Sequence, residues 1–317
     1  MTAPRPHAGA ALLLLILVAL PAGVARAQTV HLVVPFRGGG VADSVARIVV
    51  NQIPASRQFA VENRFGDDGH FGAELVSRAE SDGRTLLFAP VANYAVAASA
   101  YKSLHYSFPG DFAGVTLVAN APHALLAHPS LPVQSVADLI ALARAHPGRL
   151  KWASEGKLAL SQLEIDLFRQ LTGIKVEAVP YAASDKALPE LLNGNAVLLF
   201  TAIAAALPHV KSGRLRALAV ASGHRSPTLP ALPTVAESGV KGFEAEYWYA
   251  VLAPDGTDKA VIAKLSGELG KAVGAREVRD RLQFYGIEAR ASAPADVDRM
   301  MRAETAKWAP LVKAAAR

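Results

Sequence analysis

Short β-prone runs alternate with helical patterns along most of this chain, and that alternation constrains the fold more than any other feature. The first run reads VHLVVPF, and valine and isoleucine then recur at helical spacing. In this part of the chain we expect strands at 30–36, 59–62 and 85–89, with helices at 41–49 and 72–79. Repeated strand–helix–strand order predicts a mainly parallel, doubly wound sheet with helices on its faces.

The same order resumes further along the chain. Ser135 is suited to cap a helix that starts at residue 136. We expect further strands at 150–153, 175–179, 196–200, 216–220 and 247–252, and three helical patterns after residue 258. One sheet holding all these strands would be unusually large. The sequence therefore predicts two separate α/β sheets.

The first 27 residues have the pattern of a secretory signal peptide. Arg5 supplies a positive start, residues 10–20 are apolar without interruption, and Ala25-Arg26-Ala27 forms a cleavage site of the A-x-A type. The apolar run is about half as long as the roughly 20 residues needed to cross a bilayer. We expect a mature chain that starts near Gln28 and is located outside the cytoplasm.

Composition narrows the functional classes. The chain has no cysteine, so disulfides, thiolate metal sites and thiol nucleophiles are excluded. The formal net charge is +6, and removing Arg5 and Arg26 with the signal leaves 6 minus 2, or +4. Lysine and arginine are scattered and do not gather with aromatic residues, which argues against nucleic-acid binding and suits a small anionic ligand.

A run of three glycines, Gly38, Gly39 and Gly40, lies between the first expected strand and its helix. Backbone without side chains can approach an anion there, and the first turn of the helix offers unpaired N–H groups. A simple tight turn explains the same run. A dinucleotide fingerprint does not, because the G-x-G-x-x-G spacing is absent. Asp43 is expected to cap the helix.

Many segments in fixed order resemble one protein family. They are VVPFRGGGVADSVAR from Val33, VENR from Val61, DGRTLLF from Asp82, FAGVTLVA from Phe112, HPSLPVQSVADLIALARAHPGRLKWAS from His128, VPY from Val179, ALPHVKSGRLRALAV from Ala206, SPTLPALPTVAESGVKGFE from Ser226 and LAPDGT from Leu252. Over nearly the whole mature length, the chain resembles the tripartite tricarboxylate transporter substrate-binding proteins, known as the TctC or Bug family of periplasmic solute receptors.

The resemblance implies a type II periplasmic binding fold, in which two α/β lobes are joined by crossing strands and hold a ligand between them. We expect lobe 1 to comprise residues 28–124 and 249–317, and lobe 2 to comprise 125–248. The implied function is capture of a small organic acid or amino-acid-like solute and its delivery to membrane transporter subunits. The implied receptor has no cofactor or metal, binds no nucleic acid and acts as a monomer.

The resemblance also implies where the ligand lies. Loops at strand ends would hold a carboxylate through backbone amides and hydroxyls. Asn93 is expected in a loop after Phe88. Instead of binding the ligand, Ser154 could cap a helix and Tyr181 could pack between the lobes. The residues expected to bind are Phe36, Arg37, Gly38, Gly39, Gly40, Val41, Ala92, Asn93, Ser154, Gly156, Tyr181 and Thr201.

The chain departs from the family pattern where the ligand is expected. The altered positions are Ala42, 94–98, 157–160, Gln162, Val197 and Thr201. Arg37 is an added cation that could pair with a carboxylate. Asp67 and Asp68 are expected to face solvent. If they faced the cleft instead, they would favour a ligand with less negative charge than citrate. The family's ligand identity therefore does not carry over.

Two other functional classes remain as alternatives. A signalling protein with the same fold would have lost transport. An enzyme is disfavoured because the chain lacks a G-x-S-x-G or H-E-x-x-H motif. Its nine histidines are dispersed, and the five-residue spacing of His123 and His128 suits no metal site.

Overall fold

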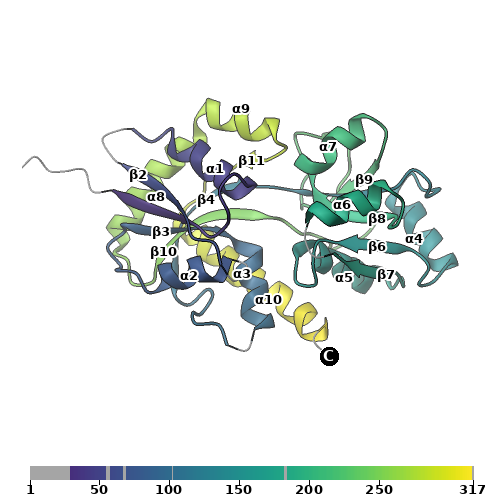
Figure 1. The fold of residues 1–317 in the computed structure, drawn as a ribbon, viewed down its shortest axis with the longest axis horizontal. Helices are drawn as coiled ribbons and strands as arrows, with labels where there is room; N and C mark the ends of the chain where they lie inside the picture. Colours follow the sequence, from purple (N-terminus) through teal and green to yellow (C-terminus); the bar gives the residue numbers. More distant parts are fainter. Residues whose placement is uncertain (1–28, 55–57, 67–68, 102, 182–183, 316–317) are drawn as a thin grey trace, which may run out of the picture.

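The computed structural model describes residues 29–54, 58–66, 69–101, 103–181 and 184–315. The expected signal peptide and the pair Asp67 and Asp68 lie outside these described residues. Figure 1 shows two groups of strands, side by side, each with helices packed around it. Within the described ranges, no helix combines the length and apolar character of a membrane span.

A six-stranded sheet forms one half of the molecule, in the order β11-β4-β10-β3-β1-β2. Its strands are β1 (Val30–Val34), β2 (Phe59–Asn63), β3 (Thr85–Pro90), β4 (Phe112–Asn120), β10 (Trp248–Pro254) and β11 (Glu288–Ala289). Its helices are α1 (Val41–Val50), α2 (His70–Ser77), α3 (Val91–Ala100), α8 (Lys259–Gly274), α9 (Arg276–Phe284) and α10 (Pro294–Ala315). The final three helices fill the region from residue 258 onward, as the sequence predicts.

A five-stranded sheet forms the other half, in the order β7-β6-β8-β5-β9. Its strands are β5 (His123–Ala127), β6 (Lys151–Ser154), β7 (Glu177–Pro180), β8 (Leu198–Ala202) and β9 (Arg216–Val220). Its helices are α4 (Val136–Ala145), α5 (Leu160–Thr172), α6 (Ser184–Leu192) and α7 (Ile203–Lys211). The predicted cap of α4 is confirmed, since the Ser135 hydroxyl accepts from the Asp138 amide at 3.1 Å.

The two-sheet α/β architecture is confirmed, but the sheets are mixed and not mainly parallel. β1 pairs in parallel with β2 and β3, and β6 pairs in parallel with β7 and β8. The pairs that involve β10, β5 and β11 are antiparallel. β4 and β10 carry the chain to and from the other half, so they run in opposite directions within one sheet (Figure 1).

The connection between the halves is hydrogen-bonded. After β4 the Ala121 amide donates to the Tyr247 carbonyl at 3.0 Å, and the Ala221 amide donates to the His123 carbonyl at 2.9 Å. The Ala245 amide then donates to the Ala221 carbonyl at 2.9 Å. Three segments distant in sequence therefore meet at the crossing, which gives the halves a defined junction.

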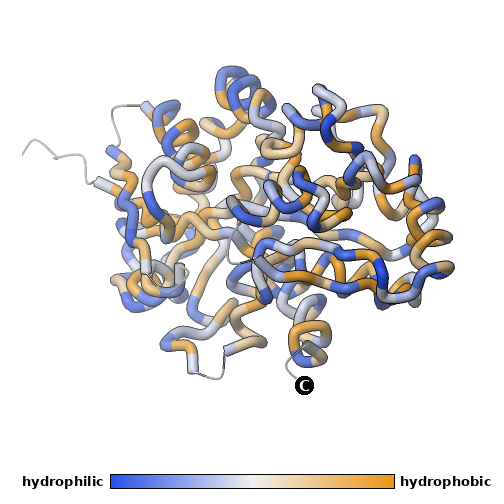
Figure 2. The backbone as a smooth tube through the Cα atoms, turned by 45° about the vertical axis from the view of Figure 1, so that its right-hand side comes forward, coloured by the Kyte–Doolittle hydropathy of each residue, from blue (hydrophilic) through white to orange (hydrophobic). Residues whose placement is uncertain are grey.

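Apolar burial explains why each sheet needs helices on both faces. The strands are largely buried, and Figure 2 shows hydrophobic and hydrophilic segments alternating along the whole chain. One buried cluster combines α2, α3, α5 and α10 with the strands, a second lies under α1, α8 and α9, and a third lies under α6 and α7. The first cluster includes residues of both sheets, for example Leu87 and Phe200. Hydrophobic packing thus spans the junction.

Two local predictions differ from the structure. The segment after Phe88, expected to be a loop around Asn93, is the helix α3. It is rich in alanine, which favours helices, and its inner face is buried. The strands β4 and β5 were not predicted, because both are buried along almost their whole length and lack an alternating pattern.

Candidate functional site

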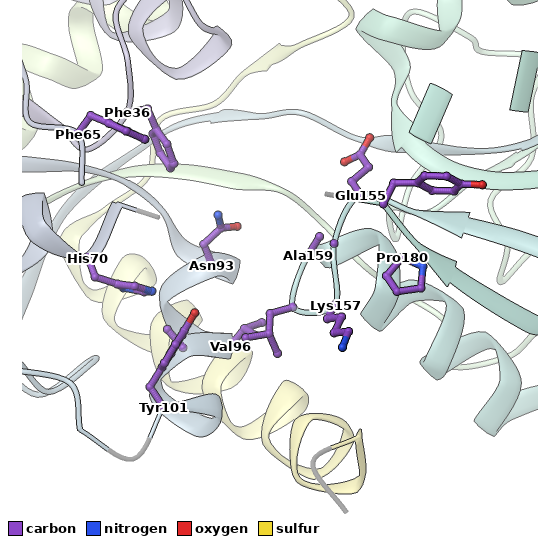
Figure 3. A pocket seen from close by; sticks show the side chains of 14 residues that line it. Phe36, Phe65, His70, Asn93, Val96, Tyr101, Glu155, Lys157, Ala159 and Pro180 are labelled. Carbon is purple, nitrogen blue, oxygen red and sulfur yellow. The ribbon is translucent and has the colours of Figure 1, made fainter. Parts of the chain in front are cut away.

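A cavity of about 640 Å³ lies between the two halves. Figure 3 shows its walls facing each other. Residues from the six-stranded half include Phe36, Phe65, His70, Asn93, Val96 and Tyr101. The facing wall consists of residues 155–159 with Pro180 and Tyr181. Aromatic and aliphatic groups dominate, and a few polar groups are placed among them, as is typical of small-molecule sites.

Helix α3 positions the polar group of the first wall. Asn93 lies in the first turn, one turn before Val96 and Ala97, so all three line the cavity. The Asn93 side chain hydrogen-bonds the hydroxyl of Tyr247, a partly buried residue. Backbone N–H groups at a helix start have no partner within the helix, so this end of α3 favours an anion.

The facing wall is the connection from β6 to α5. It runs from Ser154 through Gly156, whose φ is +146°, to Ala159 at the N-cap of α5. The Glu155 amide donates to the Ser161 hydroxyl at 2.9 Å, which fixes the start of the connection. A second helix start, with its unpaired N–H groups, therefore borders the cavity opposite α3.

Ser154 and Thr201 are both buried beneath this wall. The Ser154 hydroxyl donates to Gln162 Oε1 at 2.8 Å, so its partner is in α5. The Thr201 hydroxyl donates to Glu155 Oε1 at 2.6 Å. Thr201 thereby orients a carboxylate that lines the cavity.

The glycine loop is organised by Asp43. The Gly39 amide, at φ +84°, donates to Asp43 Oδ2 at 2.9 Å, and Asn63 Nδ2 donates to Asp43 Oδ1 at 3.0 Å. Arg47 Nε donates to the same carboxylate at 3.0 Å. Burial opposes the charge of Asp43, but Arg47 and the hydrogen bonds from Gly39 and Asn63 outweigh it and lower the pKa of Asp43. The prediction that Asp43 caps the helix is wrong, because Gly40 is the N-cap and Asp43 lies in the first turn of α1. Its charge instead holds the preceding glycine loop.

Replacing Asp43 with alanine is expected to lower the free energy of unfolding by about 1–3 kcal/mol, because several partly buried hydrogen bonds lose their acceptor. The lowered pKa means that this stabilisation is present above the ordinary value of 3.8 and is lost as the pH falls through the folded-state value. Urea unfolding at several pH values measures it.

Asp138 is a matched control for Asp43. Asp138 Oδ2 accepts a hydrogen bond from the Gln134 amide at 2.9 Å, and Gln134 precedes Asp138 by four residues, as Gly39 precedes Asp43. The side chain of Asp138, however, is exposed. Asp138→Ala is expected to cost less than Asp43→Ala. Equal losses for the two variants would contradict the role given to buried charge at Asp43.

The cavity brings together some of the residues that the sequence predicts. Phe36, Asn93, Gly156 and Tyr181 line it. Arg37 is exposed and lies over the Phe65 ring, with 4.2 Å between its guanidinium carbon and the ring centroid. The predicted residues outside the lining are Arg37, Gly38, Gly39, Gly40, Val41, Ala92, Ser154 and Thr201. Ala92, Ser154 and Thr201 are buried behind it.

Other lining residues were missed from sequence. Val96 and Ala97 would follow from Asn93 by helical spacing, had the segment been predicted as a helix. Glu155 lies between two predicted residues, and its side chain was overlooked. Phe65, His70 and Tyr101 come from separate loops and helix ends, and no sequence pattern joins them.

A buried ion pair lies behind the cavity at the junction. His123 Nδ1 is 2.9 Å from Glu164 Oε2, and the imidazole stacks on the Tyr247 ring with 5.9 Å between centroids. Burial opposes the imidazole charge, but the Glu164 carboxylate outweighs it and raises the pKa of His123. Burial likewise raises the pKa of Glu164. The described residues contain no group of three or more potential metal ligands.

Residues 45–316 match the profile of the tripartite tricarboxylate transporter family receptor. The chain belongs to this family. TctC receptors are periplasmic solute-binding proteins and not enzymes.

Relatives of the family extend the match. BugT of Bordetella pertussis is 32% identical over 90% of this chain and 89% of its own length. Rpa4515 of R. palustris, solved with adipate, is 33% identical with a TM-score of 0.76, covering 91% of this chain and 97% of its own. MatC of Rhodopseudomonas palustris, solved with malate, is 28% identical with a TM-score of 0.72, and the match covers 90% of this chain and 98% of MatC.

Proposed function

We propose that this TctC-family receptor binds a small carboxylate-containing solute in the cavity between its two halves and delivers it to membrane transporter subunits. The observation that carries the proposal is the pair of helix starts, at α3 and α5, that border one cavity from opposite walls. Their N–H groups and dipoles favour an anion between them. Related proteins solved with adipate and malate support a carboxylate.

The walls indicate more about the ligand. Phe36, Phe65 and Tyr101 on one side face Pro180 on the other (Figure 3), and Tyr181 also lines the cavity. Such surfaces suit a ligand with an aliphatic or aromatic body. The pairing of the halves through β4 and β10 gives a junction about which closure over the ligand would occur. A periplasmic location agrees with the expected signal peptide.

The proposed function predicts stabilisation by ligand. A carboxylate present at about a hundred times its Kd raises the free energy of unfolding by about 2.7 kcal/mol, since it binds only the native state. Thermal unfolding should be measured with mono- and dicarboxylates, including adipate and malate, and with amino acids. Absence of a shift with every compound would refute carboxylate binding. For any compound that binds, deleting the gene should lower its uptake by cells, and unchanged uptake would refute delivery.

A further inference from the structure

Glu155 places a carboxylate on the wall of a cavity proposed to bind carboxylates. It lines the cavity on the connection from β6 to α5, and its side chain is partly buried. The hydroxyl of Thr201 donates to Oε1 at 2.6 Å, which fixes the direction of the group. A carboxylate held in this way presents its other oxygen lone pairs as hydrogen-bond acceptors.

Glu155 has no direct ion-pair partner among the described residues. No lysine or arginine among them forms an ion pair with it. The charge of Glu155 helps to raise the pKa of His123, after the larger effect of Glu164, but the direct ion pair of His123 is with Glu164 at 2.9 Å. The pKa of Tyr247 is raised, first by burial and then by the charge of Glu155. Glu155 therefore adds negative potential to this end of the cavity.

Lys157 places a positive charge at the other end of the same wall. Figure 3 shows the Glu155 carboxylate at one end of this wall and the Lys157 side chain at the other, directed away from it. Asn93 and the start of α3 lie across the cavity. The site thus combines one fixed acceptor with several groups that favour an anion.

We infer that the ligand is a zwitterion, with a protonated amine that binds Glu155 and a carboxylate held by the helix starts. A dicarboxylate would place a second negative charge against Glu155 in a partly buried site, where like charges are costly. An amine would instead form a charge-assisted hydrogen bond with it. This inference rests on the proposed function and narrows its ligand to amino acids, including those with separated amino and carboxyl groups.

Ligand pairs that differ only in one terminal group test the inference. Titration calorimetry should compare succinate with β-alanine, glutarate with γ-aminobutyrate, and adipate with δ-aminovalerate. The native protein is expected to bind the amino member of a pair at least about tenfold more tightly, as an added ion pair in a partly buried site implies. Equal or tighter binding of the dicarboxylates would overturn the inference and leave carboxylate binding intact. Failure of all six compounds, of every amino acid and of every other carboxylate in the thermal-unfolding screen would overturn both.

Substitution of Glu155 separates its charge from other causes. Glu155→Gln is expected to abolish or reverse the preference for the amine. Glu177→Gln is the matched control, because Glu177 lies in the adjacent strand β7 and is exposed. Thr201→Val, which removes the orienting hydrogen bond, should weaken the preference without removing the carboxylate. An unchanged preference in Glu155→Gln, or the same loss in Glu177→Gln, would overturn the assignment.

Discussion

Replacing Trp152 with alanine is expected to lower the free energy of unfolding by about 3–5 kcal/mol, because the substitution leaves a large cavity in a well-packed core. The side chain is fully buried in β6, with its ring 5.2 Å from Phe168 and 5.4 Å from Phe200, centroid to centroid. Both neighbours would lose a large contact surface. Urea unfolding followed by circular dichroism measures the loss.

Trp152→Phe provides the control. Phenylalanine keeps most of the ring contacts, and the indole Nε1 that it removes has no hydrogen-bond partner among the described residues. We therefore expect a cost well below that of the alanine variant, because the cavity left is much smaller and no satisfied polar group is removed. A cost as large as that of the alanine variant would show that packing against Phe168 and Phe200 is not what Trp152 contributes.

Replacing His123 with phenylalanine is expected to cost about 3–5 kcal/mol at neutral pH, since it leaves the partner of a buried ion pair alone. The new ring can still stack on Tyr247, so the lost stability reflects the missing imidazole charge more than lost packing. Glu164 is fully buried, and its Oε1 already lacks a partner among the described residues. The folded variant must therefore keep Glu164 protonated.

The pH dependence of this loss has a definite sign. Holding a proton on Glu164 costs about 1.4 kcal/mol for each pH unit above its ordinary value near 4.5, so the deficit of His123→Phe shrinks toward pH 5. In the native protein the raised pKa of His123 contributes stability that is complete below the ordinary value of 6.5 and is lost as the pH rises through the folded-state value. Urea unfolding from pH 5 to 8.5 measures both trends.

A second substitution tests the assignment of the loss to Glu164. Adding Glu164→Leu to His123→Phe is expected to recover most of the stability at neutral pH, because a buried ion pair can be replaced by apolar groups at little cost. The double variant should also lose the pH dependence of the single one. A double variant as unstable as His123→Phe would place the loss elsewhere.

Much of the fold could be predicted from sequence because local patterns match the final structure. The expected strands at 30–36 and 150–153 correspond to β1 and β6 within a few residues. The spacing of hydrophobic residues does not identify a strand whose two faces are both buried, as in β4 and β5. There, the pattern that distinguishes strand from helix is absent.

The candidate site was less predictable for a different reason. Asn93, Gly156 and Tyr181 could be proposed because they follow strands, but a cavity also depends on how the two halves face each other. Phe65 and Glu155 are distant in sequence and line the same cavity only through the crossing of β4 and β10. The glycine loop has the composition of an anion site, yet Asp43 takes up the Gly39 amide.

The order of strands in the larger sheet also sets the order in which the molecule can assemble. β10 lies between β3 and β4, yet the five-stranded sheet is encoded between β4 and β10. A chain emerging from the ribosome can pair every strand of that smaller sheet while the larger one still has a gap at its centre. Because such non-local pairing is slow to form, closure of the larger sheet is expected to be the late step of folding. The binding cavity, which needs both halves, is therefore among the last features to form.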